Sequence, residues 1–259
     1  MIFPTPRLDK SIRLVCCLLL MLLFIPTTYA DEKLKVVWLK WGAYGDPDRV
    51  DQGIIPDMVR TVFERAGYQV TFTFQPWPRV LLGVKSGKYD VVADLWDLPK
   101  YQQDFLFLDT LQIEKISLFV LKDSPLQSGA PQALNGLTIG GVMEGGYSDW
   151  WDQANHFKKL EVAQEIQMLR LLHAKRVDAI IGDPVVVNSL IQTEMPQLIG
   201  QLRELDPPAS INRGAPAISR HHPQAQILKK RYHQAFKALR QEGLYEQMEI
   251  KHGLRLNCC

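Results

Sequence analysis

The feature that most constrains the fold is an alternation of short apolar strands with amphipathic helices, which is clearest over residues 75–109. The predicted order is a helix, a strand, a loop and a second strand, at residues 77–84, 89–93, 94–100 and 105–109. Trp77, Trp96 and Lys100 stand at the edges of this otherwise apolar unit. A sheet presents a ligand in this way, at the carboxyl ends of its strands.

The same alternation continues along the rest of the chain. Further strands are predicted at residues 34–39, 70–74, 114–122, 137–142, 160–163, 176–183, 202–205 and 213–220. Further helices are predicted at residues 53–66, 148–157, 166–173, 184–194, 223–242 and 244–252. The strand–helix–strand order of the first third predicts parallel strands with right-handed crossovers. The middle section repeats this α/β logic and is expected to have a core of its own.

Residues 1–30 are predicted to be a secretory signal peptide that is cleaved after Ala30. Three basic residues precede a short apolar run, and small residues occupy the −3 and −1 positions of the cleavage site. The run is shorter than the roughly 20 apolar residues that a membrane anchor needs. No second long apolar run follows, so we expect a soluble protein exported to the periplasm.

Removal of these residues leaves 229 residues, enough for one large domain or for two lobes of about 100 residues each. This part carries 27 Lys and Arg against 27 Asp and Glu. A balanced charge argues against a nucleic-acid partner. Cys258 and Cys259 are its only cysteines, and they could form a vicinal disulfide, pair between chains or stay free in a frayed tail. The fold must therefore rest on its hydrophobic core.

Several residues at predicted strand ends are candidates for a ligand site. Trp41 and Tyr44 follow the first strand in a loop rich in Gly, Pro and Asp. Gly145 and Gly146 open a helix, where backbone amides can hold an anion or simply form a turn. Asp183 ends a buried strand and begins a helix, so it suits both a ligand contact and a helix N-cap.

The ordered set of these segments resembles the periplasmic solute-binding proteins of polar amino acid ABC transporters, which are bacterial extracellular solute-binding proteins of family 3. The five segments that carry the resemblance are residues 53–62, 82–90, 100–109, 134–142 and 177–183. They correspond to the first helix of the family, its Gly-Lys-x-Asp step, its Arg-then-Phe segment, the entry to its second lobe and its Asp-Ala strand end. The resemblance covers nearly the whole exported chain.

The resemblance implies an α/β fold of the type 2 periplasmic-binding class, in which two lobes, each a mixed sheet flanked by helices, are joined by two crossover segments. Lobe 1 would comprise residues 31–110 and 212–259, and lobe 2 residues 111–211. A small polar solute, an amino acid or a related compound, would bind in the interlobe cleft of a monomer and pass to a membrane permease. Hinge closure around the ligand is the expected motion.

The resemblance also implies roles for single residues. Asp183 stands where the family binds the ligand's ammonium group, and Trp77 stands where it places a stacking aromatic. Lys100 replaces the arginine that clamps the ligand carboxylate, and lysine cannot supply that bidentate fork, so a solvated lysine is the alternative. Tyr147 replaces a usual hydroxyl residue after the glycines. Trp41, Tyr44 and Trp96 are further candidates for cleft walls, against the alternative of ordinary core packing.

The sequence gives less support to other functions. The six histidines show no metal-like spacing, and we find no nucleophile elbow and no phosphate-binding loop, so neither a metal nor a cofactor is expected. Some relatives dehydrate cyclohexadienyl acids, and Glu144 or Asp183 could then serve as a general acid. A third reading is the ligand-sensing module of a receptor, which we favour less because no membrane helix or signalling domain follows Gly243. A separate partner kinase remains compatible with the sequence.

Overall fold

The computed structural model describes residues 32–257. The predicted signal peptide at residues 1–30, Cys258 and Cys259 lie outside the described residues. The described residues from Lys33 onward belong to one compact unit, which contains the elements considered below except for Glu32. No helix within residues 32–257 is both long enough and apolar enough to span a membrane.

The structure confirms the predicted alternation of strands and helices. The strands are β1 (Glu32–Trp38), β2 (Tyr68–Phe74), β3 (Val91–Trp96), β4 (Phe105–Phe107), β5 (Gln112–Leu121), β6 (Thr138–Val142), β7 (Lys158–Val162), β8 (Ala179–Gly182) and β9 (Leu202–Ser219). The α-helices are α2 (Ile54–Arg65), α3 (Trp77–Lys85), α4 (Asp149–Gln153), α5 (Glu165–His173), α6 (Pro184–Glu194), α7 (Ala225–Gln241) and α8 (Leu244–His252). Short 3₁₀ segments occur at Val50–Gln52, Pro99–Tyr101, Pro131–Leu134 and Pro196–Leu198.

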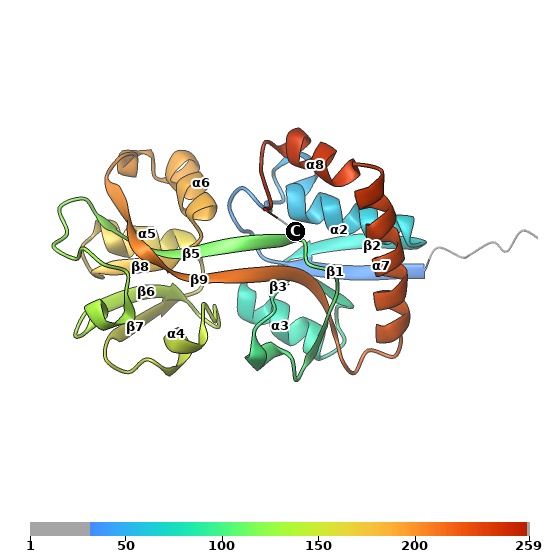
Figure 1. Cartoon of the computed structure of the whole chain (residues 1–259), viewed down its shortest axis with the longest axis horizontal. Coiled ribbons are helices and arrows are strands. Elements are labelled where there is room, and N and C mark those ends of the chain that lie inside the picture. Colours follow the sequence, from blue (N-terminus) through green and yellow to red (C-terminus); the bar gives the residue numbers. More distant parts are fainter. Residues whose placement is uncertain (1–31, 258–259) are drawn as a thin grey trace, which may run out of the picture. The chain divides into compact units, whose positions relative to one another are not determined.

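The strands form one mixed sheet in the order β2-β1-β3-β9-β5-β8-β6-β7, with β4 paired to β9. β1 pairs in parallel with β3, and β6 pairs in parallel with both β7 and β8, as the crossover prediction requires. β5 and β9 are antiparallel to each other and run from one group of helices to the other (Figure 1). The fold is therefore the predicted two-lobed α/β architecture, with β5 and β9 as the connecting strands.

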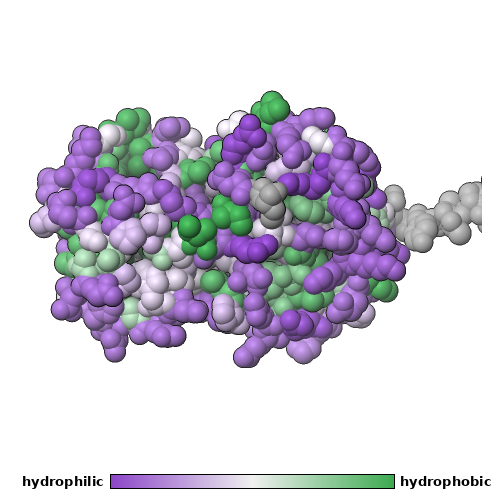
Figure 2. Space-filling model, in the orientation of Figure 1, coloured by the Kyte–Doolittle hydropathy of each residue, from purple (hydrophilic) through white to green (hydrophobic). Residues whose placement is uncertain are grey.

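Apolar side chains form two cores. The larger cluster includes β1, α2, α3, β3 and α7, and Trp38, Phe63 and Tyr232 are among its largest fully buried members. The smaller cluster packs β5, β6 and β8 around Trp151 of α4. The face shown in Figure 2 is mostly hydrophilic with small scattered hydrophobic patches. The apolar residues therefore hold the fold together from within.

Most element boundaries shift by one to three residues from the sequence prediction, and three differences change the fold or the site more. β3 continues through Trp96, so Asp94 and Trp96 lie in the strand rather than in a loop. α4 ends at Gln153, although a helix was predicted to residue 157. The strands predicted at residues 202–205 and 213–220 form one long β9, which passes through Pro207 and Pro208. These prolines lie where the β5–β9 register shifts, and a bulge needs no amide hydrogen there.

Candidate functional site

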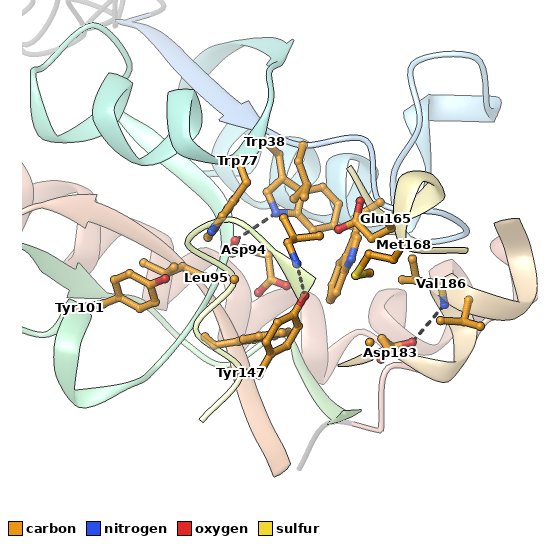
Figure 3. Close-up of a pocket in the computed structure, with 17 residues that line it drawn as sticks. Trp38, Trp77, Asp94, Leu95, Tyr101, Tyr147, Glu165, Met168, Asp183 and Val186 are labelled. Carbon is orange, nitrogen blue, oxygen red and sulfur yellow. Dashed lines mark hydrogen bonds between the residues drawn. The ribbon is translucent and has the colours of Figure 1, made fainter. Parts of the chain in front are cut away.

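A pocket lies at the carboxyl ends of β1, β3, β6 and β8 (Figure 3). Because β1 is parallel to β3 and β6 is parallel to β8, each pair delivers its following loops to one edge of the sheet. The cavity measures about 60 Å³, which is room for a few water molecules. A wider hollow of about 340 Å³ shares Leu39, Trp77 and Glu165 with it and is also lined by Lys40 and Glu194.

A row of aromatic rings forms one wall of the pocket. The ring centroids of Trp38 and Trp41 are 5.8 Å apart, those of Trp41 and Trp96 are 6.0 Å apart, and those of Trp96 and Tyr147 are 5.8 Å apart. Such spacings are typical of favourable edge-to-face and tilted pairs. The rings come from β1, its following loop, β3 and the loop after β6. Elements distant in the sequence therefore share one aromatic surface.

The loop after β1 is shaped so that Trp41 reaches this surface. The amide of Trp41 donates to the carbonyl of Gly45 at 2.7 Å, which closes a tight turn. Gly42 inside the turn has φ +52°, and a Cβ there would lie 3.0 Å from Cα of Val186. Glycine therefore permits both the left-handed backbone and the close approach of this loop to α6.

Asp94 and Glu114 form a buried acidic pair beside the aromatic row. Gln112 Nε2 donates to Asp94 Oδ2 at 2.7 Å, and Trp96 Nε1 donates to Glu114 Oε2 at 2.7 Å. Neither Asp94 Oδ1 nor Glu114 Oε1 receives a nitrogen or hydroxyl donor within the described chain. Both oxygens lie next to Gly214, where an added Cβ would be 2.5 Å from the first and 2.7 Å from the second.

One proton shared between the two carboxyl groups satisfies both orphan oxygens. Burial, with the nearby charge of Asp94 as the next cause, raises the pKa of Glu114 well above its ordinary range. Burial also raises the pKa of Asp94 to about 6. Glu114 is therefore the partner that keeps its proton at neutral pH, and Asp94 is the carboxylate that faces the pocket.

Two further acids line the pocket. Asp183 caps α6, because its Oδ1 accepts the amides of Val185 at 2.7 Å and Val186 at 3.1 Å. Its Oδ2 receives only the hydroxyl of Tyr44 at 3.5 Å, which is long for a hydrogen bond. Burial raises the pKa of Asp183 to about 6. Glu165 is partly exposed as a residue, but burial of its carboxyl group raises its pKa to about 7.

Hydrogen bonds from Trp77 of α3 and from Tyr101 to the loop after β6 close one side of the pocket. Trp77 Nε1 and the hydroxyl of Tyr101 both donate to the carbonyl of Glu144, each at 2.9 Å. Glu144 itself has φ +60° and an exposed side chain that does not line the pocket. Its backbone rather than its carboxyl group therefore takes part in the site.

Two basic side chains stand near the pocket without lining it: Lys40 lines the adjoining hollow, and Lys100 Nζ lies 5.1 Å from the ring centroid of Tyr101. Within the described part of the chain, no Lys, Arg or His lines the pocket. Lys100 forms an ion pair with Asp152 of α4 at 2.9 Å, and Arg79 is exposed. The lining that the described residues form is therefore acidic and aromatic, with no fixed positive charge.

Most of the residues predicted for the site come together. Six of them line the pocket: Trp41, Trp77, Trp96, Gly145, Tyr147 and Asp183. Tyr44 packs behind Trp41 with a centroid distance of 5.3 Å. Lys100 and Gly146 lie outside the lining, and Gly146 approaches Lys100 so closely that a Cβ would overlap the lysine side chain.

The sequence reasoning missed several lining residues: Trp38, Asp94, Tyr101, Glu165 and Met168. It also missed Glu114, which supports Asp94 from β5. The alternation Gln112, Glu114, Ile116 along β5 contained a signal, because a period of two places Glu114 on the same buried face as Ile116. A charged residue on an apolar strand face indicates a functional or paired group.

A second acidic cluster lies elsewhere in the structure. One ligand atom each from Asp51, Asp57 and His252 lie within 4.8 Å of one another, so these residues could hold a metal ion. The ammonium group of Lys251 already contacts both aspartates, at 2.8 Å from Asp57, and His252 Nε2 lies 2.8 Å from Asp57 Oδ2. The side chains of the protein therefore neutralise this cluster.

The two-lobed sheet and a pocket at the strand ends define a periplasmic-binding-protein-like fold. Residues 41–254 match the bacterial extracellular solute-binding proteins, family 3, and the chain belongs to this family. The resemblance seen in the sequence is thereby confirmed. A comparison with curated protein sequences found no significant match.

Solved structures with the same fold serve different roles. A histidine kinase sensor domain with similarity to periplasmic binding proteins is 20% identical, with a TM-score of 0.75 and coverage of 85% of this chain and 95% of that one. The amino acid ABC transporter substrate-binding protein AbpA of Streptococcus pneumoniae, bound to L-arginine, is 17% identical (TM-score 0.71; 85% and 94% covered). The GluR0 ligand-binding core of Nostoc punctiforme, bound to L-glutamate, is 16% identical (TM-score 0.71; 84% and 98% covered). At these identities the likeness concerns the fold alone.

Proposed function

We propose that the protein captures a small polar solute, an amino acid or a relative, in this pocket and delivers it to the permease of an ABC transporter. The observation that carries the proposal is the pocket itself, whose walls come from the carboxyl ends of strands in both halves of the fold. Lobe 1 would comprise residues 31–110 and 212–259, and lobe 2 residues 111–211. Family membership and the amino acid bound to AbpA support the same class of ligand.

Binding is expected to stabilise a closed arrangement of the lobes. Several side chains from the proposed lobe 1 contact the proposed lobe 2, among them Tyr44, Trp77, Lys100 and Tyr101. A solute that contacts both lobes adds its interaction energy only when they are together, so it shifts the population toward closure. Export by a cleaved signal peptide would place the protein in the periplasm, where it would act as a monomer.

Ligand sensing is a second candidate function. The histidine kinase sensor domain shares the fold over 85% of this chain, and a sensor needs the same capture of a solute by two lobes. The two functions differ in the partner that recognises the closed form. Co-purification with a permease or with a kinase ectodomain, in the presence and absence of solute, distinguishes them.

Dehydration of cyclohexadienyl acids is less compatible with the site. Such substrates are anionic, whereas the pocket presents Asp94, Glu165 and Asp183. The side chain of Glu144 is exposed outside the lining, and Asp183 is engaged as a helix cap. We therefore expect no turnover when the protein is incubated with these substrates, and product formation would overturn the reading as a pure binder.

A thermal-shift screen of amino acids, their derivatives and small organic ions tests the proposed function. A solute at 100 times its Kd adds about 2.7 kcal/mol of stability. For a chain of this size, that raises Tm by about 5 to 10 °C. We expect at least one compound to reach this shift, and its effect should be lost in Asp183→Ala. The proposal fails if no compound raises Tm. Full affinity of Asp183→Ala for the best compound would leave the function standing and remove Asp183 from the site.

A further inference from the structure

The acidic and aromatic lining of the pocket indicates the chemical class of the solute. This inference rests on the proposed function. We infer that the solute is a compact organic cation, a protonated amine or a quaternary ammonium compound, which binds through its positive charge and needs no carboxylate of its own. The ammonium group would lie against the rings of Trp41 and Trp96, between Asp94 and Asp183. This ligand class differs from the zwitterionic α-amino acids, which bring one charge of each sign.

The aromatic row supplies the first argument. Six aromatic residues line the pocket: Trp38, Trp41, Trp77, Trp96, Tyr101 and Tyr147. Trp38, Trp77, Tyr101 and Tyr147 are labelled in Figure 3. The face of an aromatic ring attracts a cation, most strongly for tryptophan, and the attraction grows when water is excluded. Trp38 is 1% exposed and Trp41 is 8% exposed, so the site is largely shielded from solvent. A site with this many rings favours a cation over an anion or a neutral polar group.

Unused acceptors supply the second argument. Asp183 Oδ2 has only the long contact to Tyr44, and Asp94 carries the charge of a pair that has no basic partner among residues 32–257. Buried carboxylates are normally paired with a cation, because desolvation without compensation is costly. The described lining contains three acids and no base, so the missing positive charge is the one that the ligand would bring.

Three groups that could hold a carboxylate are engaged elsewhere, which is the third argument. Lys100 is paired with Asp152 at 2.9 Å. The amide of Gly145 donates to the carbonyl of Val142 at 3.0 Å, and the amide of Trp151 donates to Ser148 Oγ at 3.2 Å. These two amides of the glycine turn and of the start of α4 thus donate to acceptors within the fold. A ligand carboxylate would meet Asp94, Asp183 and Glu165 with no basic side chain in the described lining to compensate its charge.

Matched pairs of probes test the inference by calorimetry at pH 8 with the full exported chain. Each pair compares an amino acid with its decarboxylated amine: arginine with agmatine, lysine with cadaverine, and histidine with histamine. A fourth pair compares choline with its neutral isostere 3,3-dimethyl-1-butanol, which keeps the shape and removes the charge. We expect at least one amine or choline to bind, and its carboxylated or neutral partner to bind at least about 100-fold more weakly. Selective binding of choline assigns the main role to the rings, and selective binding of a primary amine assigns it to the carboxylates.

Two variants connect the binding to the residues named. Asp183→Asn keeps an N-cap acceptor and removes the charge, and Trp41→Leu keeps an apolar side chain and removes the ring. We expect Asp183→Asn to abolish detectable binding and Trp41→Leu to weaken it about 10-fold. Asp178→Asn is the matched control, because Asp178 lies at the other end of β8, is exposed, and accepts the amide of Thr138 at 2.7 Å. Its affinity should equal that of the parent protein.

The outcomes separate this inference from the proposed function. If amino acids bind as tightly as their amines or more tightly, the inference is wrong while the solute-binding function stands. The same holds if only sugars or organic anions bind, or if the amine binds equally well to Asp183→Asn and Trp41→Leu. If no solute of any class binds, the proposed function fails as well.

Discussion

Replacing Asp183 with asparagine is expected to stabilise the unliganded protein at pH 8 while it weakens solute binding. Burial raises the pKa of Asp183 from its ordinary value of 3.8 to about 6, in spite of the two amides that it accepts. One pKa unit corresponds to about 1.4 kcal/mol, so the ionised carboxylate costs the folded state about 3 kcal/mol. Asparagine keeps an oxygen for the α6 cap and carries no charge, and it should recover most of this free energy.

Chemical denaturation at two pH values measures this effect. At pH 8 we expect the free energy of unfolding of Asp183→Asn to exceed that of the parent by up to about 3 kcal/mol. Near pH 4 the parent carboxyl is protonated, so the difference should vanish. Asp183→Ala removes the cap as well and should gain about 1 kcal/mol less than asparagine. Asp178→Asn controls for the change in net charge, since this exposed residue keeps its hydrogen bond. A variant that is less stable than the parent at pH 8 would refute the reasoning.

The remaining predictions concern the surrounding groups. Glu114→Gln should leave stability at pH 8 unchanged or higher, because its amide can donate to Asp94 as the shared proton does; chemical denaturation that shows a loss above about 1 kcal/mol contradicts this. Gly214→Ala should lower Tm, since a Cβ there would overlap both carboxyl groups. Trp77→Phe removes a donor to the Glu144 carbonyl and should weaken solute binding measured by calorimetry, with an unchanged Kd as the opposing result.

The pH dependence of the unliganded protein provides a further prediction. The folded pKa values of Asp94 and Asp183 lie above their unfolded values, so the folded state binds more protons. Their contribution to stability is complete below about pH 4 and is lost as the pH rises through about 6. Tyr44, Glu114 and Glu204 face these acids, and none of them supplies a positive charge. The free energy of unfolding of the parent should therefore fall relative to that of an Asp94→Asn, Asp183→Asn double variant from pH 4 to pH 8. A difference that stays constant with pH would contradict the assignment.

Periodicity and turn residues predicted most of the fold because they report local chemistry. The helix from Trp77 and the helix after Asp183 begin where capping and apolar spacing indicate. Local rules were wrong at Pro207 and Pro208, because β9 continues through them by means of a bulge opposite β5. The pairing of β9 with β3 and β5 depends on residues about 100 positions apart, which no local pattern specifies.

The candidate site was only partly predictable, for a related reason. Aromatic residues at strand ends were found because strand ends are visible in the sequence, and Trp41, Trp96 and Tyr147 do meet in the pocket. The pairing of Asp94 with Glu114 brings two strands together at a glycine of a third, and no spacing within the sequence encodes it. The ion pair between Lys100 and Asp152 likewise appears only in the folded chain, where it removes the expected carboxylate clamp from the pocket lining.

Proton release on binding is the most direct test of a cation site among buried acids. A cation that binds beside Asp94 and Asp183 lowers their pKa values from about 6, so the carboxyl groups must lose protons. The best cationic probe from the screen should be titrated by calorimetry at pH 6 in buffers with different ionisation enthalpies. We expect a net release of protons that disappears in the double variant Asp94→Asn, Asp183→Asn along with the binding itself. Binding with no proton exchange, or with proton uptake, would contradict the proposed site.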